Sequence, residues 1–79
     1  MKVLVAEDET IIRLDLVEML ARAGLEVVAE ARDGLEAVEL ARSELPDLAV
    51  LDVKMPRLDG IEAARRILDE RPIDRKSVV

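Results

Sequence analysis

The 79-residue sequence contains no cysteine, no histidine and no aromatic residue. Without cysteine, the chain can form neither a disulfide nor a thiolate metal site. Without histidine, it lacks the commonest general base and a common zinc ligand, and it cannot itself carry a phosphohistidine. Leucine, isoleucine and methionine are the largest side chains available to a core. A small domain of this composition is expected to be marginally stable by itself.

Basic charge and long apolar runs are also scarce. Twelve Lys and Arg residues oppose eighteen Asp and Glu residues, which gives a net charge of −6. We therefore expect no nucleic acid to bind this segment. No apolar run approaches the roughly 20 residues of a membrane-spanning helix, and the acids at 7–9 come too early for a signal peptide. These features favour a cytoplasmic protein that binds no membrane.

Three short apolar runs, at residues 3–6, 25–31 and 48–51, are typical of β-strands. The first and third are unbroken, as in strands buried on both faces of a parallel sheet. The second alternates and carries glutamates, which suits an edge strand.

Three segments with helical features alternate with these runs. Residues 10–23 repeat apolar side chains with helical spacing and stop before Gly24. Two further helices begin after Asp33 and Asp59, each with a glutamate three residues later, as in a capping box. Pro46 ends the second helix, and the third runs from about 60 to 70. The expected inner faces are, in order, Ile12, Leu16, Met19, Leu20 and Ala23; Ala37, Val38, Ala41 and Leu45; and Ile61, Ala64, Ile67 and Leu68. Alternating strands and helices predict an α/β fold with a parallel sheet.

Acidic side chains follow two of the predicted strands. Glu7 and Asp8 come directly after the first strand, and Asp52 comes directly after the third. Parallel strands present their carboxyl ends at the edge where ligands bind, so neighbouring strands would bring these acids within several Å. Carboxylates so placed raise one another's pKa unless a cation is present. Mg²⁺ prefers such oxygen ligands, and the backbone carbonyl of Lys54 is placed to supply another.

These acids also allow other interpretations. Any one of them taken alone is most simply a solvated residue at a strand end. A metal-dependent phosphohydrolase with an aspartyl nucleophile would favour a second acid two residues after Asp52, where Lys54 stands. The sequence has no glycine-rich dinucleotide-binding or phosphate-binding motif.

Four stretches, VLVAEDE, GLEAVELA, PDLAVLDVKMP and LDGIEAARRI, together resemble the receiver domain of two-component response regulators. The AEDE opening and the DVKMPRLDG loop are most similar to receivers that are attached to ANTAR-type antiterminator outputs. The resemblance implies a flavodoxin-like parallel sheet whose three strands lie in the order 2-1-3. It also implies a phosphoacceptor signalling module rather than an enzyme.

The resemblance further implies a role for each acid. Asp52 would accept a phosphoryl group from the histidine of a sensor histidine kinase, or from a small acyl phosphate. Asp8 would bind Mg²⁺ directly, Glu7 would act nearby through water, and the Lys54 backbone carbonyl would complete the protein ligands around Asp52.

The sequence departs from the family pattern towards its end. Receiver domains have five strands and this chain supplies three, so we expect a partial receiver domain at 2–70 and a tail of uncertain origin at 71–79. The third strand would then be an open edge, which invites pairing with another chain. We therefore predict a homodimer or larger assembly. The alternative function is a truncated, self-associating α/β fragment without phosphotransfer activity.

Overall fold

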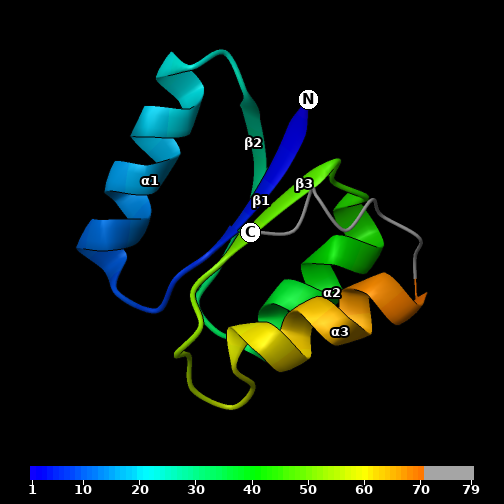
Figure 1. The fold of residues 1–79 in the computed structure, drawn as a ribbon. Helices are drawn as coiled ribbons and strands as arrows, with labels where there is room; N and C mark the ends of the chain where they lie inside the picture. The colour runs from blue at the N-terminus through cyan, green and yellow to red at the C-terminus, as the bar shows by residue number, and fades with distance from the viewer. Residues whose placement is uncertain (71–79) are drawn as a thin grey trace.

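The computed structural model describes residues 1–70, and the predicted tail at 71–79 lies outside the described residues. Strands and helices alternate along the chain in the order β1 (Lys2–Ala6), α1 (Thr10–Arg22), β2 (Glu26–Ala31), α2 (Gly34–Glu44), β3 (Leu48–Leu51) and α3 (Gly60–Glu70). All strand pairs are parallel, and the sheet has the order β2-β1-β3 (Figure 1). The predicted α/β fold and the strand order 2-1-3 are confirmed. None of the helices within residues 1–70 is long and apolar enough to cross a membrane.

Helices cover the two faces of the sheet unevenly. In Figure 1, α1 lies alone on one side of the sheet, while α2 and α3 lie together on the other. The larger core forms between the sheet and the pair of α2 and α3. Its fully buried members include Leu4, Ala6, Ala31, Ala37, Ala49, Ala63 and Ile67. Alanine predominates in this core, which lets the helices approach the sheet closely.

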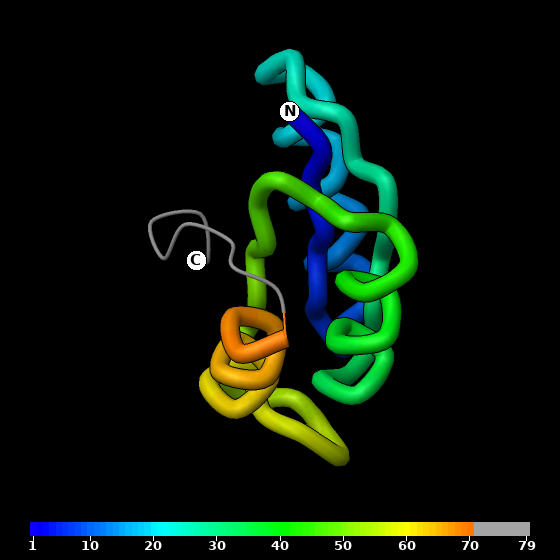
Figure 2. Tube along the Cα trace, turned by 90° about the vertical axis from the view of Figure 1, so that its right-hand side faces the viewer, coloured from blue at the N-terminus to red at the C-terminus, as the bar shows by residue number. Residues whose placement is uncertain are grey.

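Both predicted capping signals are confirmed. The backbone N–H of Glu36 donates to Asp33 Oδ1 at 2.9 Å, and the backbone N–H of Glu62 donates to Asp59 Oδ1 at 2.8 Å. Each bond satisfies one of the N–H groups that a helix start leaves without an intrahelical partner. Figure 2 shows the loop between β3 and α3 projecting beyond the start of α3.

The expected inner face of α1 is largely wrong. Leu16 and Leu20 are half-buried, but Ile12 and Met19 are 49% and 64% exposed, and Ala23 is also exposed. The reason is that α1 packs against β1 and β2, and no other helix of residues 1–70 lies on its side of the sheet. The sheet therefore covers only part of the apolar face of α1.

Two other inner-face assignments are wrong for local reasons. Leu45 is 53% exposed because α2 ends there and the residue takes a left-handed conformation, with φ of 49°. Ile61 is 64% exposed, whereas Ala63 is fully buried. Two residues along an α-helix are about 200° apart around its axis, so Ile61 faces away when Ala63 faces the core.

Two glycines allow the loop after β3 to lie against the rest of the fold. A Cβ atom on Gly34 would lie 1.9 Å from the carbonyl oxygen of Leu58, and one on Gly60 would lie 2.0 Å from the carbonyl oxygen of Asp52. In both cases the obstructing atom belongs to the backbone. The backbone must therefore move to accept a side chain at either position.

Gly34→Ala is expected to destabilise the chain by about 3 kcal/mol, at the upper end of the usual cost of overpacking. Gly24→Ala is the matched control, because Gly24 has φ of 88° and nothing within 4 Å of an added Cβ. Its cost should be the backbone strain alone, about 1 kcal/mol. Urea unfolding followed by circular dichroism measures both free energies. Equal losses in the two variants would contradict the predicted contact.

Candidate functional site

The register of β1 and β3 sets two acidic residues side by side. Ala6 pairs with Leu51, and the backbone N–H of Asp52 donates to the Ala6 carbonyl at 3.0 Å. Glu7 and Asp52 are the next residues along these parallel strands. Both therefore lie at the carboxyl edge of the sheet, which is where open α/β sheets bind ligands.

The structure brings together the three acids named from the sequence. Glu7, Asp8 and Asp52 each offer a carboxylate oxygen, and these oxygens lie within 4.8 Å of one another. Glu7 is 7% exposed, Asp52 is half-buried and Asp8 is exposed, so the cluster runs from the interior to the surface. Oxygen donors at this spacing suit a hard divalent cation such as Mg²⁺.

Burial is the main cause that raises the pKa of the Glu7 carboxyl above its ordinary value. The backbone N–H of Glu9 donates to Glu7 Oε1 at 3.1 Å and offsets part of this effect. Asp52 and Asp8 raise the pKa further. Desolvation and nearby negative charge both disfavour an ionised carboxylate, and a cation placed among the three groups relieves both.

Arg13 attaches α1 to the end of β1, a role that the sequence did not reveal. Its Nη1 donates to the backbone carbonyl of Glu7 at 2.8 Å, and its Nε donates to Glu30 Oε1 at 3.4 Å. Arg13 is the only buried residue of α1, at 8% exposed. The sole signal in the sequence was an arginine within an apolar stretch, and its partner on β2 is 17 positions away.

A hollow of about 470 Å³ opens beside the acidic cluster. The loop after β3 forms most of its wall, and its lining residues are Asp8, Val53, Lys54, Met55, Pro56 and Asp59. The backbone N–H of Gly60 donates to the Val53 carbonyl at 3.0 Å, which closes the base of this loop. The loop therefore places Lys54 at the same hollow as Asp8.

The fold is that of a known class of signalling domains. The family model of the response regulator receiver domain matches residues 3–79. The chain belongs to the response regulator receiver family.

Individual relatives agree with this assignment. The transcriptional regulatory protein PdtaR of Mycobacterium tuberculosis is 60% identical over 70 residues, which are 89% of this chain and 34% of that protein. The response regulator domain of Thermotoga maritima CheB is 40% identical with a TM-score of 0.85, over 91% of this chain and 55% of that one. A LuxR-family response regulator from Aurantimonas sp. SI85-9A1 is 37% identical with a TM-score of 0.83, over 87% of this chain and 50% of that one. This chain thus spans about a third of the curated relative's length.

Glu7→Gln is expected to raise the free energy of unfolding at pH 7, without divalent cations, by about 1 kcal/mol, a typical size for a point substitution. The folded state holds the Glu7 proton more tightly than the unfolded state, so stability falls as pH rises from the ordinary value of 4.5 through the raised pKa. The variant removes this fall, and its amide oxygen can still accept the Glu9 N–H. Urea unfolding between pH 4 and pH 8 measures the free energy of unfolding of the parent and the variant.

Glu9→Gln is the matched control, because Glu9 is the exposed neighbour and no described side-chain bond depends on its carboxylate. It should leave the free energy of unfolding at pH 7 unchanged. A Glu7→Gln variant that is less stable than the parent at pH 7 without cations would show that Glu7 is not penalised as an anion.

Proposed function

We propose that Asp52 is the phosphoacceptor of this receiver and that Glu7, Asp8 and the Lys54 backbone carbonyl serve it as the metal-binding groups. The observation that carries this proposal is the meeting of three carboxylates within 4.8 Å at the carboxyl edge of the sheet. Membership of the receiver family implies a sensor histidine kinase as the phosphodonor. The product is an aspartyl phosphate, which is a signalling state of the chain.

The proposed reaction needs no base within the chain. A carboxylate nucleophile, unlike the hydroxyl of serine or threonine, has no proton that a general base must remove before it attacks phosphorus. The new P–O bond forms as the P–N bond to the kinase histidine breaks, and the histidine nitrogen keeps that electron pair. The absence of histidine from this chain is therefore compatible with the reaction.

The donor set fits Mg²⁺. All the candidate ligands are oxygens, and a partly exposed cluster leaves room for the waters that Mg²⁺ keeps. When bound, Mg²⁺ neutralises negative charge on the phosphoryl oxygens. Asp8 and Asp52 would bind it directly, together with the Lys54 carbonyl, while the buried Glu7 acts nearby.

The contribution of the chain itself is to hold the acidic residues in place. The paired strands fix where Glu7 and Asp52 emerge, and Arg13 holds the Glu7 carbonyl. Phosphoryl transfer is catalysed mainly by placement and charge neutralisation, so fixed strand ends are the protein's main contribution. The 60% identity to a transcriptional regulatory protein supports the narrower proposal that this receiver serves an ANTAR-type output.

Incubation of the chain with acetyl phosphate and Mg²⁺ is expected to add one phosphoryl group to Asp52, because a small acyl phosphate can replace the kinase as donor. Intact-mass spectrometry measures the gain, and peptide analysis locates it. Asp52→Asn should abolish the gain, and Asp8→Ala should reduce it by weakening the metal site. A chain that binds Mg²⁺ but never gains mass would refute Asp52 as the phosphoacceptor.

One observation favours a second function, self-association. Within residues 1–70, β3 pairs only with β1, so its other edge carries unpaired backbone groups. Leu48 and Val50 on this strand remain half-buried. Edges of this kind are templates for pairing with another chain. A second copy of the chain, pairing along β3, would satisfy these groups.

Light scattering after size-exclusion chromatography is expected to show a dimer or larger species at micromolar concentration. Val50→Lys should shift the chain towards monomer, because charge on an edge strand opposes pairing. Ser43→Lys, at an exposed position on α2, is the control and should leave the mass unchanged. A folded monomer of the unaltered chain at these concentrations would rule out association through β3.

A further inference from the structure

The loop after β3 is attached to the start of α2 by one arginine. Arg57 Nε donates to Asp33 Oδ2 at 3.0 Å, and Arg57 Nη2 also donates to the same oxygen. The other oxygen, Asp33 Oδ1, accepts the N–H of Glu36 and so caps α2. Asp33 is 8% exposed. A single buried carboxylate therefore joins the first turn of α2 to a loop that lies 24 residues away in the sequence.

The backbone at this contact is held in an unusual conformation. Arg57 has φ of 65°, in the left-handed region that non-glycine residues seldom adopt. Strained residues persist only where the surrounding structure over-determines them. The neighbours of Arg57 are held by two contacts. The Leu58 N–H donates to the Pro56 carbonyl at 2.7 Å, and the Leu58 carbonyl lies against Gly34.

The ionised state of Asp33 favours a lasting ion pair with Arg57. Burial raises the pKa of its carboxyl, but the hydrogen bonds from Glu36 and Arg57 outweigh burial, so the pKa lies below its ordinary value. Asp33 thus stays ionised at neutral pH, opposite a guanidinium that is always charged.

In the sequence, the attachment comes late in the loop that begins at Asp52. At its base the loop is fixed by the Asp52 N–H bonded to Ala6 and by the Gly60 N–H bonded to Val53. Lys54 to Pro56, between this base and Arg57, line the hollow beside Asp8. Displacement of Arg57 would therefore change the placement of the Lys54 carbonyl, with the buried Met55 as the remaining anchor.

We propose that Arg57 and Asp33 are positioning residues of the phosphoacceptor site, and that their contact fixes the loop in the conformation that presents the Lys54 carbonyl to the metal. This inference rests on the function proposed above. The contact acts through the backbone of residues 54–57 and touches neither the metal ligands nor the phosphoryl group.

The test is a Mg²⁺ titration of the whole 79-residue chain, read by calorimetry. Arg57→Met is expected to weaken Mg²⁺ binding about tenfold, at the low end for residues that orient metal ligands. Asp33→Asn, which can still cap α2, should weaken it equally. The double variant should be no weaker than either single one, because all three lack the same contact. Arg57→Lys keeps a charged donor and should recover part of the affinity.

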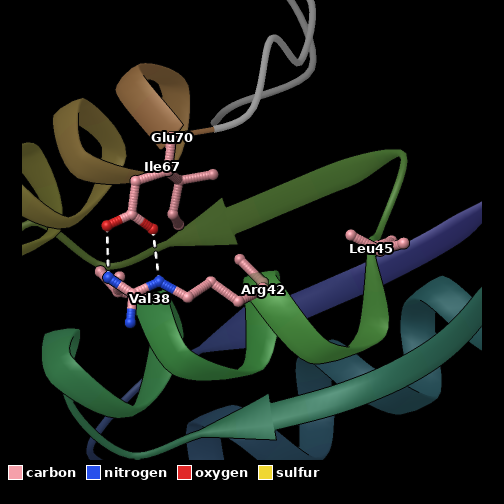
Figure 3. A pocket seen from close by; sticks show the side chains of 6 residues that line it. Val38, Arg42, Leu45, Ile67 and Glu70 are labelled. Carbon is pink, nitrogen blue, oxygen red and sulfur yellow. Dashed lines mark hydrogen bonds and ion pairs between the residues drawn. The ribbon is translucent and has the colours of Figure 1, made fainter.

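Arg42→Met is the matched control for loss of stability. Arg42 on α2 pairs with Glu70 on α3 through two hydrogen bonds, beside a cavity of about 200 Å³ between these helices (Figure 3). This pair lies at the opposite ends of α2 and α3 from the loop, so its loss should leave Mg²⁺ affinity unchanged. Equal weakening by Arg42→Met and Arg57→Met would overturn the proposal, as would unchanged affinity in Arg57→Met.

Amide hydrogen exchange separates this proposal from the function on which it rests. Arg57→Met should speed exchange at residues 53–58 and leave the strands protected, whereas Arg42→Met should not affect the loop. If the unaltered chain binds no Mg²⁺ and gains no phosphoryl group, the proposed function fails. In that case, amide exchange still tests whether Arg57 positions residues 53–58. Unchanged exchange at these residues in Arg57→Met would overturn that role. If Asp33→Asn fails to fold, the Arg57 variants still test the contact. The Arg57 side chain is 60% exposed, so its replacement leaves the core intact.

Discussion

Parallel pairing of β1 with β3 is the constraint on which the site depends. It sets Glu7 beside Asp52, and three carboxylates then meet where they repel one another. The fold holds them there because β1 is anchored independently of them. Residues 3–6 are at most 1% exposed, and the strand is bonded on both sides. A slip of one residue in this register would turn every side chain of β3 to the other face and separate the acids.

Two buried carboxylates, Asp33 and Glu7, differ in how their surroundings change their pKa values. Asp33 is met by two backbone N–H groups and a guanidinium, and its pKa is lowered. Its negative charge therefore stabilises the fold above its ordinary pKa, and this contribution is lost as pH falls through the lowered value. Burial and, to a lesser degree, the neighbouring Asp52 and Asp8 raise the pKa of Glu7, so its ionised form destabilises the fold. Of these two carboxylates, Glu7 is the one whose ionised form a nearby cation would stabilise most.

Local signals in the sequence predicted most of the fold. Unbroken apolar runs indicated the strands, Asp33 and Asp59 marked two helix starts, and acids at two strand ends indicated the cluster. The sequence could not show how much of α1 would be covered, because Ile12 and Met19 lie on an apolar stripe whose exposure depends on what else packs against that side of the sheet. It also could not show the contacts of Arg13 and Arg57. Their partners are 17 and 24 residues away, and no local period encodes such pairs.

The edge of β3 that is unpaired within residues 1–70 lies next to the acidic cluster, because Asp52 directly follows this strand. A second strand bonded along Leu48–Leu51 would restrict the strand end from which Asp52 and the loop emerge. A partner that favours the same strand geometry as a bound cation must bind more tightly when the cation is present, and the cation must then bind more tightly in the assembly. If both occur, pairing along β3 and metal binding at its end would be coupled. Within residues 1–70, the strand Leu48–Leu51 thus has one unpaired edge and ends directly before the candidate phosphoacceptor Asp52.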